Sequence, residues 1–90
     1  MAANIREVER RIEERLINKS SVLDLSNCNL IGNEKILEKL KKANSLQILN
    51  LSNNKISDIS VLKELKSLQV LYLNNNLISD ITDLKDLKKL

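Results

Sequence analysis

Few side chains in this sequence of 90 residues are of types that carry out chemistry. Cys28 is the only cysteine and there is no histidine, so neither a nucleophile–base pair nor a zinc site with the usual ligands can be assembled. Asp58 and Asp80 recur at equivalent places, but two carboxylates fall short of the roughly six to eight oxygen ligands that Ca²⁺ takes. We interpret both as caps of local turns. The sequence therefore predicts a protein that is not an enzyme and that uses no metal and no cofactor.

The elements that position these residues are defined by a repeated segment. Residues 45–66 read SLQILNLSNNKISDISVLKELK and residues 67–88 read SLQVLYLNNNLISDITDLKDLK, and 15 of the 22 aligned positions are identical. The pattern L-x-x-L-x-L-x-x-N-x-[IL] occurs in both, with a period in the range of leucine-rich repeats. A solenoid fills a thin slab with repeated aliphatic side chains, which agrees with a chain that contains a single aromatic residue.

A helix is predicted ahead of the repeats, over residues 4–18. Its apolar stripe consists of Ile5, Val8, Ile12 and Leu16, at spacings of three and four. Asn4 is a good N-cap, and Glu7 three residues later predicts a capping box. The natural place for the stripe is the open end of the solenoid, whose core would otherwise face water. We interpret the helix as this cap, because two heptads are too few for the alternative, a coiled-coil dimer.

The first repeat is longer than the two that follow it. Its additional residues come after Gly32, and their apolar spacing predicts a true α-helix over residues 33–42 with Asn33 as N-cap. Shorter turns, 3₁₀ or irregular, are expected in the other repeats. The predicted organisation is one domain with a helical cap (1–19), a divergent repeat (20–45), a second repeat (46–67) and a third repeat with an incomplete C-terminal end (68–90).

The segments NKISDI (54–59) and NLISDI (76–81) resemble the SDS22-like class of leucine-rich repeats, shared by phosphatase-1 regulatory subunits and bacterial internalins. The first repeat, with its cysteine and predicted helix, is similar to the ribonuclease-inhibitor-like class. This resemblance implies an α/β fold: a right-handed solenoid with a parallel β-sheet on the concave side and a helix, then short turns, on the convex side. It also implies protein binding without naming the partner, and the chain is far shorter than members of those families.

Strand side chains that neighbour the inward leucines point outward and form the predicted partner-binding face. This face consists of Val22, Asp24, Ile48, Asn50, Val70, Tyr72 and Asn74, with Ser26 and Ser52 in the same column as Asn74. Exposed aliphatic side chains beside the only aromatic suggest an interaction patch, since tyrosine is common at binding hot spots. The alternative, that these residues only favour strand formation, stays open.

Asn54 and Asn76 are predicted to form a structural ladder at the turn that ends each strand. A side-chain amide both donates and accepts hydrogen bonds, so it satisfies backbone groups that the turn leaves unpaired. Cys28 falls in the same column, where cysteine is the accepted alternative, and is predicted to be a buried small hydrophobic residue.

The last repeat has no recognisable C-terminal cap, so its apolar side chains are expected to face solvent. The predicted self-association edge consists of Leu71, Leu73, Leu84, Leu87 and Leu90. Open strands and apolar patches recruit partners. The alternative to the protein-binding function is therefore a self-assembling unit, or a fragment of a longer repeat array, that forms homo-oligomers through this edge.

Charge and hydropathy narrow the choice of partner and compartment. The net charge is +3, with both signs interspersed, which argues against nucleic acid as a ligand. No apolar run is long enough to span a membrane, and the first residues lack the apolar core of a secretion signal. A cytoplasmic location is predicted, with the nucleus as an alternative.

Overall fold

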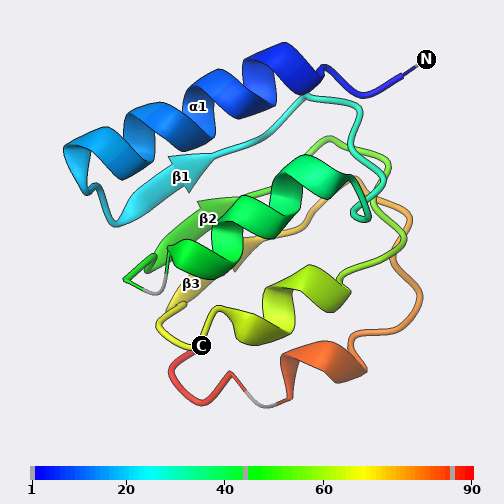
Figure 1. Cartoon of the computed structure of the whole chain (residues 1–90). Coiled ribbons are helices and arrows are strands. Elements are labelled where there is room, and N and C mark those ends of the chain that lie inside the picture. The colour runs from blue at the N-terminus through cyan, green and yellow to red at the C-terminus, as the bar shows by residue number, and fades with distance from the viewer. Residues whose placement is uncertain (1, 44, 86) are drawn as a thin grey trace.

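The computed structural model describes residues 2–43, 45–85 and 87–90, and it consists of three stacked coils covered at one end by a helix (Figure 1). The elements in chain order are α1 (Ile5–Asn18), β1 (Val22–Asp24), η1 (Lys35–Lys42), β2 (Ile48–Asn50), η2 (Ser60–Glu64), β3 (Val70–Tyr72) and η3 (Thr82–Leu84), where η denotes a 3₁₀ helix. Each coil contains one short strand and one return helix. This arrangement confirms the predicted α/β solenoid with an N-terminal helix.

The three strands form one parallel sheet in the order β1-β2-β3. The register aligns one residue of each strand at every position: Val22 with Ile48 and Val70, Leu23 with Leu49 and Leu71, and Asp24 with Asn50 and Tyr72. A slip of one residue would turn every inward leucine to the outside. The constant register therefore keeps the inward and outward columns of the sheet separate across all three strands.

The hydrophobic core lies between the sheet and the 3₁₀ helices and continues beneath α1. Leu46, Leu49 and Leu68 have no exposed surface, and the α1 residues Val8 and Ile12 are 0% and 1% exposed. The helix α1 packs against both β1 and η1 (Figure 1). It therefore covers the end of the first coil, as the apolar stripe predicts.

The start of α1 differs in one respect from the predicted capping box. The Asn4 side chain accepts a hydrogen bond from the Glu7 backbone N–H at 3.4 Å, as expected for an N-cap. The reciprocal bond is absent, because the Asn4 backbone N–H donates to the Cys28 carbonyl at 2.9 Å. The Glu7 carboxylate instead accepts charge-assisted bonds from Arg10 and Arg11, which are stronger than a bond to a neutral amide.

The α-helix predicted over residues 33–42, with Asn33 as N-cap, is wrong. η1 is a 3₁₀ helix, and Glu34 occupies its N-cap position without a side-chain capping bond. The Glu34 carboxylate accepts hydrogen bonds from the backbone N–H groups of Ile31 and Gly32, at 2.7 and 2.8 Å. Glu34 thus stabilises the turn that precedes the helix.

The apolar spacing in η1 suits three residues per turn. Leu37, Leu40 and Ala43, each three residues apart, are all buried in the core. A 3₁₀ helix places residues i and i+3 directly above one another and rises about 2.0 Å per residue, against about 1.5 Å for an α-helix. The tighter helix therefore both buries this column and spans more of the return path with the same residues.

Candidate protein-binding face and the adjacent groove

The ends of the strands are fixed by asparagine side chains. Asn54 is 8% exposed, and its Oδ1 accepts hydrogen bonds from the backbone N–H groups of Cys28 and Leu30, at 2.9 and 3.0 Å. Its Nδ2 donates to the carbonyls of Leu25, Leu51 and Ser52. One side chain thus satisfies backbone groups of two successive repeats, which holds the face of the sheet rigid.

The other two members of this column differ in environment. Asn76 is only half-buried, and its Oδ1 accepts from the Ile56 N–H at 2.9 Å. Cys28 is 1% exposed, and its thiol donates to the Ser26 carbonyl at 3.3 Å. Burial raises the pKa of the Cys28 thiol, so the group is protonated at neutral pH and unsuited to nucleophilic or metal chemistry.

A second recurrent motif holds the turns with short polar side chains. Asp24, Asn50, Asp58 and Asp80 each accept the backbone N–H and the hydroxyl of the residue two positions later, at Ser26, Ser52, Ser60 and Thr82 respectively. These hydrogen bonds lower the pKa values of the three aspartates, because each bond favours the charged form. Asp58 and Asp80 therefore act as the turn caps expected of them. No group of three potential metal ligands lies together in the described ranges.

The outward face of the sheet, called the concave face below, is formed by Val22, Asp24, Ile48, Asn50, Val70, Tyr72 and Asn74. Val22, Val70 and Tyr72 are 49%, 37% and 51% exposed, and Ile48 is half-buried. The strand register places these side chains on three adjacent strands. Of the two serines predicted to extend this face, Ser52 does not, because it is 7% exposed, whereas Ser26 is half-buried. The hydroxyls of Ser26 and Ser52 donate to the side chains of Asp24 and Asn50.

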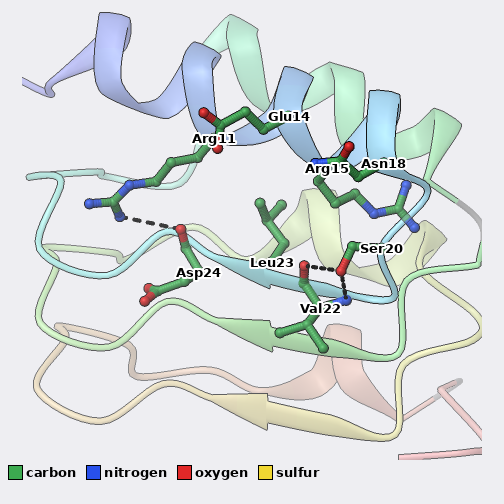
Figure 2. Close-up of a pocket in the computed structure, with 8 residues that line it drawn as sticks. All are labelled: Arg11, Glu14, Arg15, Asn18, Ser20, Val22, Leu23 and Asp24. Carbon is green, nitrogen blue, oxygen red and sulfur yellow. Dashed lines mark hydrogen bonds between the residues drawn. The ribbon is translucent and has the colours of Figure 1, made fainter.

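The free edge of β1 is closed by two side chains that the sequence does not single out. The Ser20 hydroxyl bonds both the N–H and the carbonyl of Val22, at 3.1 and 3.2 Å (Figure 2). Arg11 of α1 donates to the carbonyls of Asp24 and Ser26, at 3.2 and 3.0 Å. The sequence does not reveal the contacts of Arg11, because a charged residue in a helical pattern resembles a solvent-exposed one. These contacts depend on how α1 packs against the sheet.

An open groove of about 370 Å³ lies between α1 and β1, beside the concave face (Figure 2). It is lined by Arg11, Glu14, Arg15, Asn18, Ser20, Val22, Leu23 and Asp24. Arg15 is only 6% exposed and donates from Nη2 to the Ser45 hydroxyl at 3.0 Å, while its buried Nε has no partner in the described part of the chain. Burial lowers the pKa of Arg15.

The predicted self-association edge is only partly exposed. Leu71, Leu73 and Leu84 are half-buried, and Leu90 is 47% exposed. The expectation that Leu87 faces solvent is wrong, since it is 4% exposed. After η3 the chain turns back, with the Leu87 N–H donating to the Leu84 carbonyl at 3.1 Å, and this turn places Leu87 in the core cluster.

Comparison with known proteins assigns the repeats. A family model described as leucine-rich repeats (two copies) matches residues 44–89, and a single leucine-rich repeat model matches residues 21–42. The chain belongs to the leucine-rich repeat family. Proteins built from these repeats are typically non-enzymatic interaction modules that bind other proteins. None of the described helices of this leucine-rich repeat protein is long and apolar enough to cross a membrane.

The solved structures include a similar protein. An internalin, InlF from Listeria monocytogenes, superimposes with a TM-score of 0.74 and 26% sequence identity. The match covers 100% of this leucine-rich repeat chain and 31% of the internalin chain, so the chain spans about a third of its length. A search of curated proteins gave no match.

Proposed function

We propose that this leucine-rich repeat protein is a non-enzymatic interaction module that binds a protein partner through its concave face. The observation that carries the proposal is an outward column in which Val22 of β1 and Val70 of β3 are exposed on either side of the half-buried Ile48 of β2, with the exposed Tyr72 on β3. Exposed apolar groups that are contiguous mark interaction sites more often than scattered ones do. Tyr72 adds an aromatic body with a hydroxyl, the combination that is enriched at binding hot spots.

The rigidity of this face supports the same proposal. Asn54 and the Asx turns fix the backbone at the ends of the strands. A preorganised surface loses less conformational entropy on association than a mobile one does. Strand propensity favours valine, isoleucine and tyrosine alike, so the experiment below separates the two explanations.

The test compares two exposed apolar residues on different faces. The wild-type protein and the variants Tyr72→Ala and Ile17→Ala are immobilised at equal density and exposed to the same cell lysate. The lysate proteins that each one retains are then quantified by mass spectrometry. Ile17 is 78% exposed on α1, so it controls for the loss of an exposed apolar side chain away from the concave face. Specific partners should be retained by wild type and Ile17→Ala and lost from Tyr72→Ala, with the circular dichroism spectra unchanged. Equal retention by Tyr72→Ala would refute the concave face as the binding surface.

Self-association through the last repeat is a second candidate function. Leu71, Leu73 and Leu84 keep more exposed surface than their counterparts Leu49, Leu51 and Leu62, which are 0%, 3% and 1% exposed. Ile81 is 65% exposed next to them. Light scattering at about 100 μM should then give a dimer or larger species that Ile81→Glu dissociates. A wild-type mass of 10.3 kDa would contradict this candidate.

The proposal includes two finer assignments, the class of the repeats and the cellular location. We propose that residues 46–90 are repeats of the SDS22-like class, which their NKISDI and NLISDI segments resemble, and that the first repeat is of the ribonuclease-inhibitor-like class. The cytoplasmic location stays a prediction from the sequence.

A further inference from the structure

A buried positive charge, Arg15, lies at the junction of α1 with the first repeat, and no carboxylate among the described residues pairs with it. Buried guanidinium groups are normally paired with carboxylates, because removing an ion from water is costly. The ion pairs of the described residues all involve other side chains, and Arg15 has a hydroxyl partner, Ser45, at one nitrogen only. Its buried Nε has no hydrogen-bond partner within residues 2–43, 45–85 and 87–90. The free protein therefore holds Arg15 in an arrangement that an added carboxylate would relieve.

The position of Arg15 connects this charge to the concave face. Figure 2 shows Arg11 and Asp24 toward one end of the groove, and Arg15 with Ser20 toward the other. Val22 belongs both to the groove and to the concave face. A partner that covers the concave face at β1 therefore reaches the groove without a separate docking surface.

The other charges of the groove already have partners. Arg11 binds Glu7 at 2.7 Å, Glu14 accepts from Arg10 at 2.7 Å, and the Asp24 carboxylate accepts from Ser26. Each of these charges is balanced or hydrogen-bonded within the chain. Of the two arginines that line the groove, Arg15 is thus the one without a carboxylate partner among the described residues, and it favours an anionic ligand group.

The closed edge of β1 decides how a partner can enter the groove. The Ser20 hydroxyl already bonds both backbone groups of Val22, and Arg11 occupies the carbonyl of Asp24. These contacts occupy the outward backbone groups of Val22 and the carbonyl of Asp24, which disfavours the addition of a strand by an extended segment. This edge therefore favours recognition through an inserted side chain.

We propose that the groove between α1 and β1 binds the side-chain carboxylate of an acidic protein segment, with Arg15 as the residue that recognises it. This inference rests on the proposed protein-binding function, to which it adds the chemistry of the partner. The planar guanidinium suits a carboxylate, and the bond is strengthened because the site is largely shielded from water. Glutamate or aspartate is the expected source, because the groove is beside the face that the partner covers.

The experiment follows the side-chain Nε–Hε signal of Arg15 by ¹⁵N NMR in the full chain. The probes are N-acetyl-glutamate amide, its neutral analogue N-acetyl-glutamine amide, and N-acetyl-alanine, which carries only a terminal carboxylate. We expect a saturable shift at Arg15 with the glutamate probe, and at least tenfold weaker binding of the glutamine probe. Equal or stronger binding of N-acetyl-alanine would move the site to chain ends and overturn the side-chain assignment. Equal, unsaturable shifts at Arg6 and Arg10 would show charge screening only, and would also overturn the proposal.

Two variants separate recognition from structural support. Arg15→Met removes the charge and keeps the length, and Arg6→Met does the same at an exposed position of α1. Arg15→Met should abolish binding of the glutamate probe and unfold at a higher urea concentration than wild type, since an unpaired buried charge is lost. A lower midpoint would show that Arg15 serves stability and would overturn the proposal. If Tyr72→Ala loses the partner but still binds the glutamate probe, the concave face and the groove act as separate sites. If Tyr72→Ala still captures the partner and still binds the probe, only the proposed concave face is refuted.

Discussion

The asparagine column allows one residue type to be compared in two environments within the same protein. Replacing Asn54 by alanine leaves the buried N–H groups of Cys28 and Leu30 without an acceptor. It also removes the donor to the carbonyls of Leu25 and Leu51. Each buried polar group left unpaired costs about 1–3 kcal/mol. The two amides alone therefore predict a loss of about 2–6 kcal/mol in the free energy of unfolding.

The matched control is Asn76→Ala. Its Oδ1 accepts from one backbone N–H, that of Ile56, and the side chain is half-buried, so water can replace part of what is lost. A cost of about 1–2 kcal/mol is expected on the same basis. A domain of this size has a total stability of roughly 5–13 kcal/mol, so Asn54→Ala removes a large share and Asn76→Ala a small one.

Urea unfolding followed by far-ultraviolet circular dichroism measures both variants, because the chain contains no tryptophan to serve as a fluorescent probe. The midpoint should fall in the order wild type, Asn76→Ala, Asn54→Ala, with similar slopes. If Asn76→Ala lowers the free energy of unfolding as much as Asn54→Ala does, the number of buried amides left unpaired does not determine the loss. The asparagines would then stabilise the fold through some other property.

Three further predictions concern single residues. Gly32→Ala should unfold at a markedly lower urea concentration than Asn33→Ala, since Gly32 has φ +113° and an added Cβ would lie 1.8 Å from the Asp58 carbonyl oxygen. Hydrogen bonds from two arginines lower the pKa of Glu7 from 4.5 to about 2. Its stabilising effect is complete above about pH 4.5 and is lost as the pH falls toward 2, so Glu7→Gln should lower the Tm at pH 7 and leave it unchanged below pH 2. Cys28, 1% exposed, should react with iodoacetamide only after unfolding; native labelling at the rate of the unfolded chain would contradict its burial.

The solenoid is predictable from the sequence because its leucine columns repeat with a fixed period and must share one core. The alternation of strand side chains also predicts which residues share the concave face, as the exposure of Val70 and Tyr72 illustrates. The α-helix predicted after Gly32 fails because apolar residues at Leu37 and Leu40 suit both 3.6 and three residues per turn. Their spacing alone does not distinguish the two helices.

The groove could not be found in this way. Arg11 and Arg15 occur among the charged residues of α1, and in the sequence they resemble its solvent-exposed positions. Their burial depends on the rotation of α1 against β1 and η1, which is a tertiary property. Only the structure distinguishes Arg15, 6% exposed, from Arg6 on the outer side of the same helix.

The two edges of the sheet differ in which backbone groups and side chains they offer to a binding partner. At β1 the outward groups of Val22 and the carbonyl of Asp24 are occupied by Ser20 and Arg11, which favours contact through side chains and the charge of Arg15. At β3 the odd-numbered backbone groups, those of Leu71 among them, point away from β2, because groups of successive residues alternate between the two sides of a parallel strand. Strand addition is therefore favoured at β3 over β1. An acidic ligand that competes with the partner should leave self-association through the last repeat unaffected, because the two processes use opposite edges of one rigid sheet.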